Sequence, residues 1–194
     1  MSTIRNLVIA AGLVLLGGCS AVYSPVPLGE DPLPLVAADW EGTWLFEGDI
    51  VKVRVTDAGQ GKLRLLAIDG GELDVVDVHI RTSGGWNFIS MPDEEDGEDP
   101  DSPDTNEDGQ LHYAWGRIVI EGDQLIVWAP DVAKFRRLVR EEKLPGSLVG
   151  PDGKPGDNVY LGQLEAAHYT LITSGEEGVL MDWDEPGVGI RVAK

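Results

Sequence analysis

The sequence predicts a mainly β single domain with two C-terminal helices (α+β), built as an antiparallel meander or a β-barrel. Three observations support this prediction. Apolar and polar residues alternate with a period of two in several segments, as they do in half-buried strands. Short turns rich in Gly and Asp join these segments, which makes neighbouring strands antiparallel. Residues 39–194 provide enough chain for one hydrophobic core.

The strands are expected to follow one another through the first two thirds of the domain. A first strand carries Gly42-Thr43-Trp44, and the next ones cover residues 50–56, 62–68, 72–82, 86–91, 111–120 and 124–128. In residues 50–56, for example, three valines alternate with Lys52, Arg54 and Thr56. A meander of this size has exposed edges, and curling into a barrel is the expected way to hide them.

The last third of the chain has a different pattern. Asp131 is a plausible N-cap for a helix over residues 131–142, and Pro145-Gly146 follows its end. A Pro/Gly-rich loop is expected at 143–158, followed by a second helix over 161–173 in which His168 lies on the apolar face as a core residue. Two further strands are expected at 179–183 and 188–192.

The first eighteen residues have the pattern of a secretory signal. Arg5 precedes an apolar run at 7–16, which is too short for a membrane-spanning helix of about 20 residues. The run ends in Leu16-Gly17-Gly18-Cys19, which resembles the lipobox of bacterial lipoproteins. The resemblance implies that residues 1–18 are a signal peptide cut before Cys19, and that Cys19 carries a diacylglycerol and further acyl chains such as palmitate.

The residues that follow Cys19 indicate where such a lipoprotein would be placed. By the same resemblance, Ser20 favours the outer membrane, with the domain facing the periplasm. Residues 19–38 contain four prolines among small and apolar residues, which favours an extended chain. We therefore expect a tether at 19–38 that holds the domain of residues 39–194 away from the lipid.

A second and shorter resemblance concerns Gly42-Thr43-Trp44, which is similar to the Gly-x-Trp motif of the lipocalin and calycin families. It implies an eight-stranded barrel that is closed at one end by the Trp and holds a small apolar ligand. Such a carrier needs a cavity lined by residues such as Val51, Val53, Val55 and Trp86. The alternative is that Trp40 and Trp44 fill an ordinary core.

Residues 93–109 interrupt the meander with an acidic insertion that contains no basic residue. Within it, Asp104, Asn106 and Asp108, followed by Gly109, resemble the first half of an EF-hand calcium loop. The twelfth position is Trp115 and lacks the usual Glu. Calcium is the one cofactor predicted, and the alternative is a solvated insertion that binds no metal.

The first predicted helix concentrates positive charge in an acidic chain. Lys134, Arg136, Arg137 and Arg140 lie within seven residues of one another. Such a cluster could dock on anionic lipid headgroups or on an acidic partner protein. The alternative is that these cations offset carboxylates of the same fold.

Composition excludes several functions. A formal net charge of −19 argues against binding to nucleic acid. Lipid attachment would consume the single Cys, and the three His residues have no zinc-site spacing. No nucleophile elbow, phosphate loop or dinucleotide motif is present.

The expected function is therefore that of a membrane-anchored envelope lipoprotein with a non-catalytic structural or protein-interaction role. One alternative is lipocalin-like binding of a small apolar ligand. Another is an envelope hydrolase that uses paired carboxylates.

Overall fold

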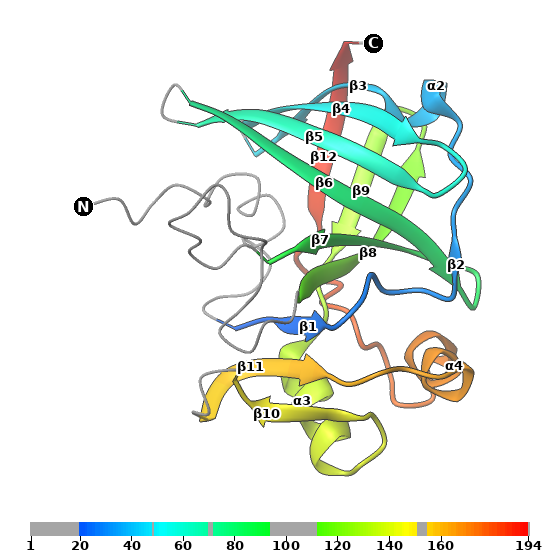
Figure 1. Cartoon of the computed structure of the whole chain (residues 1–194), viewed down its shortest axis with the longest axis vertical. Coiled ribbons are helices and arrows are strands. Elements are labelled where there is room, and N and C mark those ends of the chain that lie inside the picture. Colours follow the sequence, from blue (N-terminus) through cyan, green and yellow to red (C-terminus); the bar gives the residue numbers. More distant parts are fainter. Residues whose placement is uncertain (1–19, 48, 70–71, 94–111, 151–154, 194) are drawn as a thin grey trace.

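The computed structural model describes residues 20–47, 49–69, 72–93, 112–150 and 155–193. Eight of its strands close into an antiparallel barrel, the upper part of the molecule in Figure 1. In spatial order they are β3 (Gly42–Phe46), β4 (Asp49–Asp57), β5 (Lys62–Asp69), β6 (Glu72–Ser83), β7 (Trp86–Pro92), β8 (Tyr113–Glu121), β9 (Gln124–Trp128) and β12 (Gly187–Ala193). This confirms the predicted fold class, a mainly β domain with a barrel.

The barrel closes because β12 pairs on both sides. Ile190 lies opposite Leu45 of β3, and Val188 lies opposite Ile126 of β9. All the other neighbours in the barrel follow one another along the chain, as a meander requires. The period-two alternation of the sequence thus decides which side chains point inward, while the pairing of β12 with β3 joins the two edges.

The two ends of the barrel differ, because one of them is covered by a helix. The α2 end carries the short helix α2 (Ala37–Trp40) and the turns at 58–61 and 121–123. Because the strands are antiparallel, β3, β5 and β9 end at the opposite end, where β4, β6 and β12 begin. We call this opposite end the distal end.

The inward side chains of the barrel form one apolar cluster. Trp44 and Val78 are fully buried, and Val53 is 2% exposed. The other buried members of this cluster are Leu35, Trp40, Val51, Leu63, Leu65, Ala67, Ile80, Ile89, Met91, Ile118, Leu125 and Val127. The Trp44 indole Nε1 donates a hydrogen bond to the Trp40 carbonyl over 3.1 Å, so both tryptophans lie at the α2 end and belong to the core.

A second layer packs against the outer face of β7 and β8, in the lower part of Figure 1. It consists of β1 (Val22–Ser24), α3 (Val132–Arg140), β10 (Gly146–Val149), β11 (Pro155–Leu161) and α4 (Ala166–Ser174). Its core contains Phe88 and Trp115 of the barrel together with Phe135 and Leu138 of α3. A further two-residue strand, β2 (Asp31–Pro32), pairs with β6.

Strand β8 connects the two layers because it changes partners along its length. Its first residues, Tyr113 and Ala114, pair with β1, whereas Arg117 and the residues after it pair with β9. Strand β1 in turn pairs in parallel with β11, and β10 adds to the other side of β11. The sheet therefore branches at β8 into the barrel and the second layer.

Residues 20–38 differ from the expected tether, because they are packed into the fold. Val22 is 2% exposed and Leu28 is 1% exposed. The Ala21 amide donates to Asn158 Oδ1 over 2.9 Å, and the Leu28 amide donates to the Ser90 hydroxyl over 3.0 Å. The prolines leave this segment extended, but distant strands supply the partners that keep it in place.

Three expectations for the last third of the chain also need correction. The expected loop at 143–158 contains β10 and most of β11. The expected helix at 161–173 begins only at Ala166, because Leu161 ends β11. The expected strand at 179–183 is reduced to an isolated bridge between Pro130 and Met181.

The helices nevertheless use the predicted local signals. Asp131 caps α3, since its side chain accepts a hydrogen bond from the Lys134 amide over 3.1 Å. His168 is half-buried and is not the expected core residue. Its Nδ1 accepts a hydrogen bond from the Glu165 amide and so completes a capping box at the start of α4. Among the helices that the structure describes, none is long and apolar enough to cross a membrane.

Candidate interaction site

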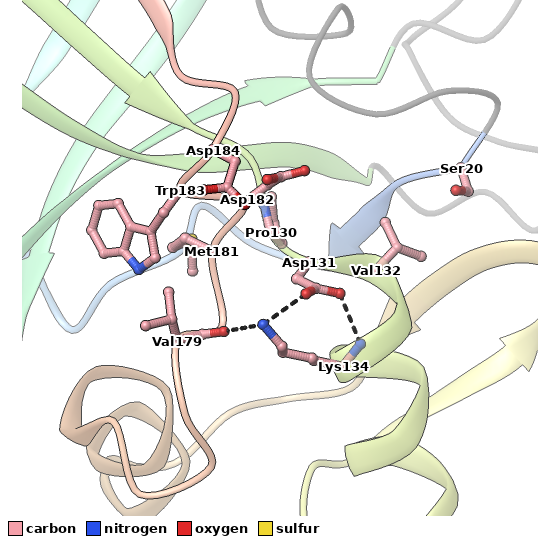
Figure 2. A pocket seen from close by; sticks show the side chains of 10 residues that line it. All are labelled: Ser20, Pro130, Asp131, Val132, Lys134, Val179, Met181, Asp182, Trp183 and Asp184. Atoms are coloured by element: carbon pink, nitrogen blue, oxygen red, sulfur yellow. Dashed lines mark hydrogen bonds and ion pairs between the residues drawn. The ribbon is translucent and has the colours of Figure 1, made fainter.

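An open groove lies between the barrel and the second layer, next to the first described residue. We call it the Ser20 groove, and its volume is about 550 Å³. It is lined by Ser20, Pro130, Asp131, Val132, Lys134, Val179, Met181, Asp182, Trp183 and Asp184. In Figure 2, Ser20 and Trp183 lie on opposite sides of the groove, with the start of α3 between them.

Backbone contacts join the two walls of the Ser20 groove. The Asp131 amide donates to the Leu180 carbonyl and the Asp182 amide donates to the Ala129 carbonyl, both over 2.9 Å. Lys134 Nζ adds a bond to the Val179 carbonyl over 2.6 Å. The segment that precedes β12 is therefore held against the chain that follows β9, at the distal end of the barrel.

The groove carries an excess of negative charge. Lys134 Nζ lies 2.8 Å from Asp131 Oδ2, so this cation neutralises the nearest carboxylate. Asp182 and Asp184 add two more carboxylates to the wall that carries Trp183. A ligand that matches this chemistry has a positive charge and an apolar part that can contact the Trp183 side chain.

Trp183 also belongs to an aromatic cluster around Arg117, which we call the tryptophan cage. The Arg117 guanidinium carbon lies 4.2 Å from the ring centroid of Trp86, 4.7 Å from that of Trp183 and 5.4 Å from that of Trp128. The Trp128 and Trp183 rings meet edge to face at 4.8 Å. A cation over aromatic faces is attracted by the negative π surface, so Arg117 holds the three indoles together.

Burial lowers the pKa of Arg117 because removing its guanidinium from water disfavours the charged form. Its Nε is buried and has no hydrogen-bond partner within the described part of the chain. The strand register places Arg117 directly opposite Trp128. The cage is thus filled by the chain's own cation, and it fixes Trp183 as one wall of the Ser20 groove.

Three of the four predicted docking cations on α3, namely Lys134, Arg136 and Arg137, contact acceptors of the same fold. Arg137 donates to Glu177 over 3.2 Å, and Lys143 donates to the other carboxylate oxygen of Glu177 over 2.6 Å. Arg136 donates to the Gly156 carbonyl over 2.9 Å and lies 3.6 Å from Asp157. Arg140 is exposed.

The hydrogen bond from Lys143 holds the pKa of Glu177 below its ordinary value, and the same bond raises the pKa of Lys143. Lys134 is paired with Asp131 in the groove. This arrangement is the one expected if the α3 cations offset acids of their own fold. Docking of Lys134, Arg136, Arg137 and Arg140 on a membrane or partner stays a prediction.

A second surface feature lies on the outside of the barrel. Five aliphatic side chains on five adjacent strands face outward in one row, which we call the aliphatic row: Ile190, Leu45, Ile50, Ile68 and Leu73. All five are exposed. Single exposed aliphatic residues are common, but a contiguous set indicates an interaction surface.

The residues expected to line a ligand cavity separate into two places. Val51 and Val53 are buried inside the barrel, and Val55 packs against the same cluster. Trp86 belongs instead to the tryptophan cage on the outer side of β7. Trp86 therefore does not face the barrel interior, which corrects that part of the carrier hypothesis.

Two predicted sites lie outside the described residues. They are the lipid-attachment residue Cys19 and the calcium ligands Asp104, Asn106 and Asp108, so both sites stay predictions. Within the described ranges, no three His, Cys, Asp or Glu side chains form a group that could hold a metal ion.

No sequence motif marks Arg117, Asp182 or Asp184 as members of a site. Arg117 lies on a predicted strand, and the three tryptophans around it are separated by long stretches of chain. The pairing of β8 with β7 and with β9, together with the return of residues 181–184 to the end of β9, brings these residues together.

The chain matches no protein-family model, no curated protein and no solved structure.

Proposed function

We propose that this protein is a lipid-anchored component of the bacterial cell envelope that acts by binding another envelope protein, without catalysis. Cys19 is the proposed anchor, and the outer membrane facing the periplasm is the proposed location. The observation that carries the interaction role is the Ser20 groove, an open and acidic surface groove immediately after the proposed anchor residue.

The packing of the barrel supports a role at the surface. The inward side chains from the α2 end to the middle of the barrel contact one another and are almost fully buried. The Ser20 groove, in contrast, is open and is lined by the carboxylates of Asp182 and Asp184, which flank Trp183 in the chain. A lysine- or arginine-containing segment of a partner protein, with an apolar residue next to the cation, fits this combination.

The anchor and the groove are tested in the same cells. Intact mass measurement of the purified protein should give a chain that begins at Cys19 and carries acyl groups, and Cys19→Ser should release the protein from the membrane fraction. A photo-crosslinking residue in place of Val132 should then give one discrete protein adduct in intact cells.

A matched pair of variants shows whether that adduct depends on the groove. Asp182→Asn with Asp184→Asn should abolish it, because the positive partner loses both carboxylates. Asp57→Asn, at the α2 end, should leave it unchanged. An unmodified Cys19 would overturn the anchor, and an adduct that persists in the double variant would overturn the groove as the binding site.

The second candidate function is the binding of a small apolar ligand inside the barrel. The closed eight-stranded barrel with Trp44 at its α2 end favours this candidate. Native mass spectrometry of the purified protein tests it. A bound small molecule that is lost in Val53→Trp would support the carrier function. A measured mass equal to that of the protein alone would contradict the carrier function and favour the role at the surface.

A further inference from the structure

We infer that the distal end of the barrel rests in the lipid surface, with Leu45, Ile50, Ile68 and Leu73 of the aliphatic row entering the interfacial layer of the bilayer. This inference rests on the proposed lipid anchor at Cys19, and it adds an orientation and a second membrane contact.

The strand register makes the aliphatic row continuous. Ile190 lies opposite Leu45, Leu45 lies opposite Ile50, and Ile68 lies opposite Leu73. The pair Val51 and Ala67 is one residue further on, so Ile50 and Ile68 also face each other. The exposed fractions are 60% for Ile50, 73% for Ile68 and 62% for Leu73. Ile190, by contrast, lies opposite Gln124 beside the turn at 121–123, so the row runs obliquely from the α2 end to the distal end.

Polarity changes along the outer face of the same strands. One step from the row toward the α2 end, Lys52 lies opposite Leu66, and Leu66 lies opposite Val75. One step further, Arg54 lies opposite Arg64, and Arg64 pairs with Asp77 over 2.7 Å. On β4, β5 and β6 the outer face is therefore aliphatic at the distal end and charged toward the α2 end, as expected for a barrel with only one end in lipid.

The proposed anchor enters at the same end. Cys19 directly precedes Ser20, and consecutive Cα atoms of a trans peptide are about 3.8 Å apart. Ser20 lines the groove between the end of β9 and the start of β12, and Ala21 is already hydrogen-bonded to Asn158. An acylated Cys19 would thus hold the distal end close to the lipid, because almost no free chain separates it from the fold.

The acidic groups at this end determine which lipids suit the contact. Glu47 and Asp49 flank the turn between β3 and β4 and are exposed. They would be repelled by anionic headgroups, whereas aliphatic side chains gain from leaving water at any bilayer surface. We therefore expect deeper insertion in zwitterionic vesicles than in vesicles rich in phosphatidylglycerol.

The experiment uses full-length acylated protein in vesicles. Single cysteines replace Ile50, Ile68 or, as a control at the α2 end, the exposed Gln60, and each carries an environment-sensitive fluorophore. Acylation occupies Cys19, so only the introduced cysteine reacts. In phosphatidylcholine vesicles, the fluorophores at 50 and 68 should shift to the blue and be quenched by nitroxide-labelled lipids, while the one at 60 should behave as in water.

A second variant keeps the inference falsifiable. Leu73→Ser with Leu45→Ser changes two exposed side chains and should reduce the quenching at position 68 without unfolding the barrel. Aqueous fluorophores at 50 and 68 on vesicle-bound protein would overturn the inference while the anchor stands. A blue shift that grows with protein concentration without vesicles would also overturn it, because another copy would then cover the row.

Failure of the anchor gives a different result. A chain without acyl groups that does not float with the vesicles would overturn the proposed function itself, whatever the fluorophores report. The inference and the proposed function can therefore fail separately.

Discussion

The guanidinium of Arg191 lies 4.6 Å from the centre of the Trp44 ring and closes the α2 end of the barrel over that side chain. The same guanidinium donates hydrogen bonds to the carbonyls of Ala38 and Asp39, next to the indole that donates to Trp40. One residue of β12 thus fastens α2 to the barrel.

This relationship predicts that Arg191→Lys destabilises the protein by about 2 kcal/mol, since lysine keeps the charge but loses the stacking and the planar fork. Urea unfolding at neutral pH measures the loss. The control is Arg54→Lys on the exposed outer face of β4, for which we expect almost no change. Equal stability of the two variants would contradict the proposed fastening of α2.

Substitutions of Arg117 should destabilise the tryptophan cage to different extents, according to how much of the side chain they remove. Arg117→Ala removes both the cation and the apolar stem and should cost about 2–3 kcal/mol. Arg117→Met keeps the stem and removes a charge that is partly desolvated, so it should cost less. Urea unfolding and the tryptophan emission spectrum report on both changes. A loss in the Met variant as large as that in the Ala variant would mean that the charge, and not the packing, holds the cage.

The ion pair between Glu177 and Lys143 should stabilise the fold only within a certain pH range. The lowered pKa of Glu177 adds stability above the ordinary value of 4.5, and this contribution is lost as the pH falls through the folded-state value. The raised pKa of Lys143 adds stability below the ordinary value of 10.5, and this contribution is lost as the pH rises through the folded-state value. The pair therefore contributes fully between those two ordinary values.

Glu177→Gln should lower stability slightly and evenly inside that window, and its difference from the wild type should shrink as the pH falls below about 4.5. The effect is small because water screens Lys143. Urea midpoints across the pH range measure it, with the exposed neighbour Glu176→Gln as the control. A difference that grew on acidification would have the wrong sign for this pair.

A side chain at position 61 should destabilise the protein, because the backbone of Ile80 lies close to Gly61. Its φ is +65°, and a Cβ placed there would lie 2.1 Å from the Ile80 carbonyl oxygen. Gly61→Ala should therefore cost more than about 2 kcal/mol, because the left-handed conformation and the clash add. Gly85→Ala is the matched control, since its φ is +78° but no atom lies within 4 Å of the added carbon. Thermal unfolding of both variants would separate strain from clash, and equal losses would argue against the clash.

The barrel could be predicted because most of its strands pair with the strand that precedes or follows them in the sequence. Alternation at Val51, Val53 and Val55 and Gly-rich turns place each strand next to its neighbour in the chain. The observed strands β4 to β9 accordingly match the predicted ranges closely. Closure followed from the need to hide edges, although the sequence alone did not identify β12 as the strand that joins β3 to β9.

The second layer could not be predicted because its partners are far apart in the chain. Val22 pairs with Val159 in parallel, and no local sequence pattern predicts such a contact. The prolines of residues 20–38 and the Pro/Gly content of 143–158 favour loops, but hydrogen bonds such as that from Ala21 to Asn158 override that preference. The tryptophan cage and the acidic wall of the Ser20 groove depend on the same distant contacts.

The position of β12 in the barrel also limits when the barrel can form. Strand β3 has β4 on one side from the start, but its other edge stays open until Ile190 reaches Leu45. A chain that emerges from its N-terminus would therefore be an open sheet until residues 187–193 had followed. Its β3 edge would stay available for pairing with other chains until β12 closes the barrel.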